Sequence, residues 1–251
     1  MAPEKKFSLH TGRMSRAPAA AAEIDVGLRE YMLRVYNYMA SGLALTGIIA
    51  YMSANTPAII NMLYAPGPTG VIQPTMLAWI VMFSPLAFIL ALSFGVNKMK
   101  ASTMQAVFWG FSAVMGLSLS NIFLTYTGVS IARVFFITSG TFAGMSLYGY
   151  TTKRDLSGFG SFLMMGLIGV IIASVVNMFL QSAVMQFVIS VIGVLVFVGL
   201  TAYDTQKIKS LYMESDGREV ATKKALMGAV TLYLDFINMF LLLLRLFGDR
   251  R

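Results

Sequence analysis

The sequence predicts an all-α protein of the membrane, built as a bundle of seven transmembrane helices. Of its 251 residues, 57% are hydrophobic and only 12% are charged, about half the charged fraction of a soluble domain. Apolar segments of about 20 residues recur along the chain, and this length crosses the hydrocarbon layer as a helix. Basic residues gather in every second connection between these segments, the pattern that orients a membrane protein.

The N-terminal segment, residues 1–22, is polar, basic and rich in alanine. It lacks the apolar core of a secretory signal, so we expect a disordered cytoplasmic tail followed by one domain over residues 23–251. From Ile24 to Val35, hydrophobic residues recur at helical intervals, and Asp25 lies four residues before Arg29. This pattern predicts an interfacial helix that leads into the first span.

Seven apolar segments have the length of a membrane-spanning helix. They are residues 35–54, 75–95, 104–126, 131–150, 159–180, 184–203 and 225–247. Seven crossings leave the basic residues Arg250 and Arg251 on the less basic side, whereas six crossings and one re-entrant segment do not. We favour seven, because charge bias is weaker for tails than for short loops.

Charge alternates between the connections. The N-terminal segment and the second, fourth and sixth connections carry most of the lysines and arginines, whereas the first, third and fifth carry no charge. This alternation predicts a cytoplasmic N-terminus. It also explains the net charge of +8 without a continuous basic face, so we expect no nucleic-acid partner.

Several kinds of chemistry are excluded or disfavoured by composition. Cysteine is absent and the one histidine, His10, lies in the polar tail, which excludes disulfides, thiolate ligands and cysteine nucleophiles and disfavours a histidine metal site. No serine nucleophile has a nearby base in the sequence. We therefore expect no enzyme activity and no resident cofactor.

Small residues within the spans predict close contacts between helices. They include Gly110, Gly116, Gly140, Gly144, Gly166 and Gly169.

Two carboxylates fall within or against the apolar segments: Asp204 near the cytoplasmic end of the sixth and Asp235 inside the seventh. Burial of either is costly unless the group is paired or protonated. Asp235 lies about ten residues, or ~15 Å, into its span, too deep to reach water by extending its side chain. Thr231 and Asn238 share its face of the helix and predict a polar stripe that lines a water-filled path.

Asp204 has two interpretations: it marks a helix end that emerges among lipid headgroups, or it meets Asp235. Two carboxylates that meet in a low-dielectric site tend to share one proton, which would form a proton-sensitive latch. The spacing of Asp216 and Glu219 predicts a helix start near Gly217. Asp235 then lies ~27 Å along its helix and Asp204 only ~12 Å from the turn, so contact would require residues 217–224 to leave the bundle axis.

Four stretches carry a family resemblance. They are VYNYMASGLALTG in the first span, TFAGMSLYGYTTKRDLSGFG across the fourth connection, AYDTQKIK after the sixth span and LYLDFINMFLLLLRLFG in the seventh. With them the chain resembles bacterial members of the Bax inhibitor-1, or transmembrane Bax inhibitor motif, family from about Arg29 to Gly248. The resemblance implies a bundle with the last helix at its centre, in the bacterial inner membrane.

The resemblance also implies a function, a pH-sensitive calcium leak gated by an aspartate pair that matches Asp204 and Asp235. Lys98 matches the basic residue that pairs with the sixth-helix aspartate and holds the pore closed. A lysine at a position where the family has arginine cannot pair in a bidentate manner. Two aspartates with Asn238 would form only a weak calcium site, because calcium prefers six to eight oxygen ligands.

A second function is also consistent with the sequence: a non-transporting membrane regulator that binds a membrane protease or another integral membrane protein. The two hypotheses differ in what they expect when Asp235 is neutralised. A leak would lose ion flux, whereas a regulator would change only in folding or binding.

Overall fold

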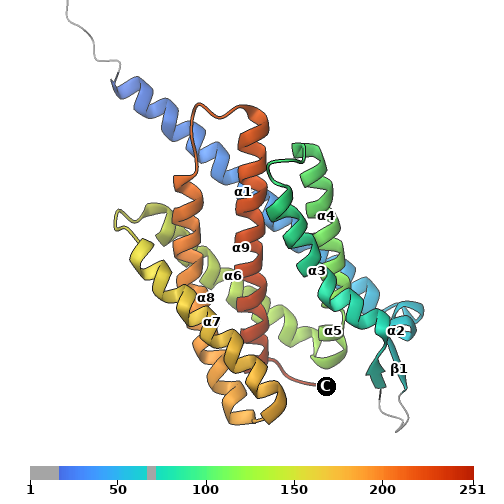
Figure 1. The fold of residues 1–251 in the computed structure, drawn as a ribbon. Helices are drawn as coiled ribbons and strands as arrows, with labels where there is room; N and C mark the ends of the chain where they lie inside the picture. The colour runs from blue at the N-terminus through green and yellow to red at the C-terminus, as the bar shows by residue number, and fades with distance from the viewer. Residues whose placement is uncertain (1–16, 67–71) are drawn as a thin grey trace, which may run out of the picture.

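The computed structural model describes residues 17–66 and 72–251, which form a bundle of long helices with one short hairpin (Figure 1). The elements are α1 (Ala17–Ala54), α2 (Pro57–Leu63), β1 (Tyr64–Pro66), β2 (Ile72–Pro74), α3 (Met76–Gly95), α4 (Ala101–Ser118), α5 (Asn121–Thr125), α6 (Gly128–Thr151), α7 (Ser157–Leu180), α8 (Ala183–Ser210) and α9 (Arg218–Phe247).

The long helices have the dimensions of membrane spans. Taken with α5 as one segment, α4 is long and apolar enough to cross, as are α3, α6, α7, α8 and α9. α1 meets the same condition together with α2, to which it is bent by 90°. The described residues therefore hold six crossings, or seven if this bent pair is one span. The predicted class, an all-helical polytopic membrane protein, is confirmed.

Two features of the N-terminal third differ from the predicted elements. α1 begins at Ala17, so residues 17–22 of the tail that we predicted to be disordered form the first turns of a helix that continues into the first span; residues 1–16 lie outside the described part. The charge-free first connection holds α2 and the antiparallel pair β1–β2. Pro57 stands at the first position of α2, where its missing N–H costs nothing.

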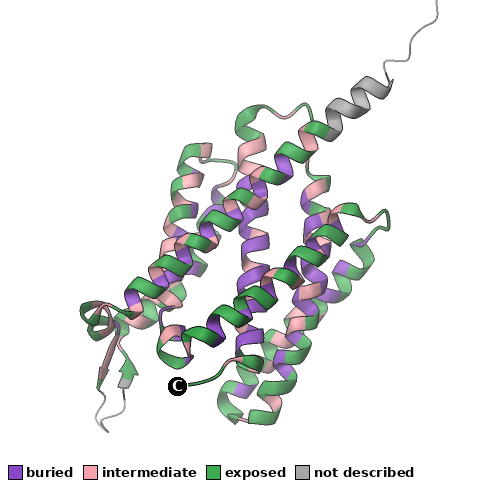
Figure 2. Cartoon of the chain, turned by 180° about the vertical axis from the view of Figure 1, so that it is seen from behind, coloured by how far each residue is buried: buried purple, intermediate pink, exposed green. Residues whose placement is uncertain are grey.

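α9 is the centre of the bundle, as predicted. In its apolar window 72% of the residues are buried, against 11% in α3 and in α7. It packs against α1, α4, α6 and α8, and the buried residues concentrate along it (Figure 2). α7, by contrast, packs mainly against α8. Most of the other helices therefore turn one face to lipid, and lipid is as apolar as the helix contacts themselves.

The two ends of the bundle differ in charge and in how helices begin there. We call the end that holds the connections after α3, α6 and α8 the basic end, and the other the opposite end. At the opposite end Thr75, Thr127 and Ser182 each accept a hydrogen bond from the third amide of α3, α6 and α8, the usual N-cap geometry. At the basic end, α4, α7 and α9 begin without a side-chain cap from the N-cap residue.

Lys224 ties the start of α9 to the end of α8. Its ammonium group donates to the backbone oxygen of Leu211, at 3.0 Å, and to Asp216 Oδ2, at 2.6 Å. Its neighbour Lys223 forms only an i to i+4 pair with Glu219, at 3.4 Å.

We expect Lys224→Met to lower the free energy of unfolding by about 1–2 kcal/mol, because it removes two charge-assisted hydrogen bonds and leaves Asp216 without its cation. Lys223→Met should cost less than about 0.5 kcal/mol, as surface pairs of this spacing do. Thermal unfolding of both variants in the same detergent measures the difference. Equal effects of the two substitutions would contradict the proposed tie.

Candidate functional site

The two membrane aspartates line the same cavity. Asp204 lies in the last two turns of α8 and Asp235 lies in the middle of α9. A cavity of about 520 Å³ between α7, α8 and α9 is lined by both. Their carboxyl groups are near enough to interact directly across the helix interface. Of the two interpretations of Asp204, the structure therefore shows the one in which it meets Asp235.

The aspartates meet because the connection between α8 and α9 is long enough. Asp204 lies ~9 Å before the end of α8, and Asp235 lies ~26 Å after the start of α9. The seven residues 211–217 between the two helices span up to ~23 Å, more than this difference. The first turns of α9 continue along the axis past the end of α8 (Figure 1). Our expectation that residues 217–224 must leave the axis was wrong.

Asp235 is deeply buried and incompletely satisfied. Its side chain is 5% exposed, and its Oδ2 atom has no hydrogen-bond partner in the described part of the chain. The cost of such a group falls if the carboxyl is protonated or if a cation lies beside it. The atom therefore marks the point of the cavity where a proton or a cation is stabilised most.

The predicted polar stripe of α9 faces the same cavity, since Thr231 and Asn238 line it together with Asp235. The Thr231 hydroxyl donates to the backbone oxygen of Met227, at 3.1 Å, and the Asn238 amide donates to that of Leu234, at 2.9 Å. Both side chains thus direct donors to their own helix and keep oxygen lone pairs for the cavity. An oxygen-rich lining suits a hard cation better than an anion.

The far end of the cavity holds a residue that the sequence analysis did not single out. Arg245 lines it ten residues after Asp235, ~15 Å along α9. Two further hollows, of about 230 and 490 Å³, also include Arg245, and both include Asn177 and Gln186. Hollows therefore run from the aspartates to the opposite end. The available signal was the spacing, because Arg245 lies seven residues after Asn238 on the same face.

Lys98 is not part of this arrangement. It lies in the turn after α3, its side chain is exposed, and it is absent from the aspartate cavity. In the described ranges it forms no ion pair. The cation that acts on Asp204 is Lys207, one turn further along α8. No group of three or more acidic or histidine side chains with metal-site spacing occurs among residues 26–66 and 73–251.

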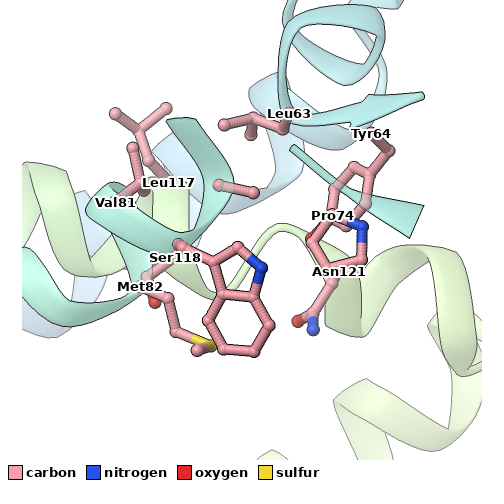
Figure 3. A pocket seen from close by; sticks show the side chains of 10 residues that line it. Leu63, Tyr64, Pro74, Val81, Met82, Leu117, Ser118 and Asn121 are labelled. Carbon is pink, nitrogen blue, oxygen red and sulfur yellow. The ribbon is translucent and has the colours of Figure 1, made fainter. Parts of the chain in front are cut away.

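A separate hollow at the opposite end has a different character (Figure 3). It measures about 240 Å³, lies between the hairpin, α3 and α4, and includes Leu63, Trp79 and Met82 in its lining. No acidic or basic side chain lines it, so the aspartate cavity is the better candidate for ion chemistry.

The comparisons cover the whole membrane region. Residues 28–251 match the family described as "Inhibitor of apoptosis-promoting Bax1". The chain is 50% identical over 227 residues to an uncharacterized protein of Rickettsia prowazekii, covering 90% of this chain and 92% of that protein. It is 45% identical over 242 residues to the inner membrane protein YbhL of Escherichia coli K12, covering 95% and 100%. An uncharacterized protein of Caulobacter vibrioides is 44% identical over 246 residues, which is 98% of each chain.

Proposed function

Because this chain belongs to the Bax inhibitor family of membrane proteins, we propose that it is a pH-sensitive cation leak, permeable to calcium and gated by Asp204 and Asp235. The inner membrane is its proposed location, as the name of the Escherichia coli relative indicates for that protein. With the basic end in the cytoplasm, the N-terminus lies there too.

One observation carries this proposal: two carboxyl groups from adjacent membrane helices share one cavity, and Asp235 Oδ2 has no partner within the described residues. Such a pair is stable in the membrane while it holds a proton. When the proton leaves at higher pH, the cavity gains negative charge, and a cation becomes the group that stabilises it. The oxygens of Thr231 and Asn238 then supplement the carboxylates as weak ligands.

The same proton supports a gate. While the pair is protonated, it holds α8 against α9; after deprotonation, two like charges face each other across this interface and favour an arrangement in which the helices separate. α7 packs mainly on α8, so it would move with α8 and widen the cavity between itself and α9. The leak should therefore increase as pH rises.

Reconstitution tests this directly. Purified protein in liposomes that enclose a calcium dye should show influx that rises severalfold from pH 6 to pH 8, because the aspartate pair loses its proton over this range. In Asp204→Asn and Asp235→Asn the pH-dependent part should disappear. Asp155→Asn is the matched control, because Asp155 is an exposed carboxylate in the connection before α7.

All variants are first shown to elute as folded protein. Absence of a leak at every pH, or an unchanged pH profile in both membrane variants, would overturn the proposal. The first result would favour the alternative function, a regulator that binds a membrane protease or another membrane protein.

A further inference from the structure

A second polar cavity lies at the basic end, apart from the aspartate pair. It measures about 600 Å³ and is formed by the N-terminal half of α1 and the first turns of α4 and α9. Its lining consists of Arg34, Tyr38, Lys100, Ala101, Ser102, Gln105, Arg218, Glu219 and Thr222. It shares no residue with the aspartate cavity.

Three cations from three segments meet in this cavity: Arg34 on α1, Lys100 before α4 and Arg218 on α9. None of them forms an ion pair with any described residue. The one carboxylate of the lining, Glu219, is paired with Lys223, outside the cavity. Like charges that converge without a counterion repel one another, so the cavity favours an anion.

The backbone adds to this preference. α4 and α9 both begin at the cavity, and their N-cap residues, Lys100 and Gly217, provide no side-chain cap. The three helices that begin at the opposite end are all capped by a threonine or serine side chain. The first amides of α4 and α9 therefore lack the acceptor that the other helix starts have, and helix starts attract anions.

The cavity is also fixed in shape by contacts between its walls. The Gln105 amide donates to the Tyr38 hydroxyl, which joins α4 to α1. Lys224 holds the start of α9 to the end of α8. The cations are thus presented by connected helices and not by loose tails, so less ordering is needed when a ligand binds.

We propose that this cavity binds a phosphate-bearing anion, held by Arg34, Lys100 and Arg218 together with the uncapped amides of α4 and α9. A bound phosphate would fix the start of α9 relative to α1 and α4. The phosphate can belong to the headgroup of an anionic phospholipid, since Lys100 and Arg218 stand where the helices leave the membrane, or to a soluble compound. The proposal is independent of the aspartate leak.

Binding is measured with two probes at 50 mM KCl. Pyrophosphate is titrated into protein in a non-ionic detergent, and phosphatidylglycerol is added to phosphatidylcholine nanodiscs, with the thermal unfolding midpoint as the readout. One probe or both should raise the midpoint of the unmodified chain in a saturable manner, less so at 500 mM KCl. Lys100→Gln and Arg218→Gln should each weaken apparent affinity by about tenfold.

Lys98→Gln is the control, since Lys98 lies two residues from Lys100 but outside the cavity, and it should leave the affinity unchanged. All variants must match the unmodified chain in elution and in midpoint without anion. A pyrophosphate response assigns the site to soluble compounds, and a response to phosphatidylglycerol alone assigns it to lipid headgroups. No response to either probe, or an equal loss in Lys98→Gln and Lys100→Gln, would overturn the proposal. Calcium flux does not enter the readout.

Discussion

Asp235→Leu is expected to make the protein more stable while it removes the pH-dependent leak. The native carboxyl is 5% exposed and carries an oxygen without a partner in the described structure, and it faces a second carboxyl. Leucine removes both costs, and the adjoining cavity of about 520 Å³ has room for it. We expect a gain of about 1–2 kcal/mol, or about 2–8 °C in Tm.

The matched control for this gain is Asp216→Leu. Asp216 is paired with Lys224 at 2.6 Å, so its loss should lower Tm. Thermal scans at one heating rate in one detergent give both values, and calcium influx at pH 8 gives the activity. Opposite signs for the two aspartates would show that Asp235 is kept for function at the expense of stability. A lower Tm for Asp235→Leu would mean that the carboxyl stabilises the fold.

Gly149→Ala should be among the most damaging single-methyl changes in the bundle. A Cβ atom at Gly149 on α6 would lie 2.2 Å from the backbone oxygen of Ala202 on α8. Backbone cannot move aside as a flexible side chain can, so α6 and α8 would have to separate. The Ser146–Thr205 hydrogen bond, 3.0 Å long and one turn away, would be strained as well. We expect a loss of about 2–3 kcal/mol, or about 4–12 °C in Tm.

Gly144→Ala on the same helix is the control. A Cβ atom there would meet nothing within 4 Å, so the variant should be neutral or slightly more stable, since alanine is the better helix former. Thermal unfolding in detergent compares the two variants directly. If both lower Tm by the same amount, helix flexibility and not close packing explains the loss.

The glycines show where sequence reasoning reached its limit. Of those predicted to mark helix contacts, Gly116 lies against the Thr46 backbone, but Gly140, Gly144 and Gly169 face open space, and Gly149 was missed. The helices themselves were predictable, because about 20 apolar residues have few alternatives in a membrane. The faces were not, because a lipid-facing surface is as apolar as one that faces another helix.

The candidate site was predictable in part for a related reason. A carboxylate in an apolar span is conspicuous, and Asp235, Thr231 and Asn238 all line the cavity as expected. Whether Asp204 reaches Asp235 depended on the path of seven connecting residues, which helix arithmetic did not define. Lys98 was placed by resemblance alone, and in the structure it lies outside the cavity.

The position of α9 has a consequence for how the protein is made. A chain is synthesised from its N-terminus, so α9 leaves the ribosome after every helix that packs around it. Until then the hydroxyl of Thr46 lacks Tyr233, its partner at 2.7 Å, and Asp204 lacks Asp235. The first helices must wait in the membrane around a vacant centre, and the bundle acquires its core in one late step.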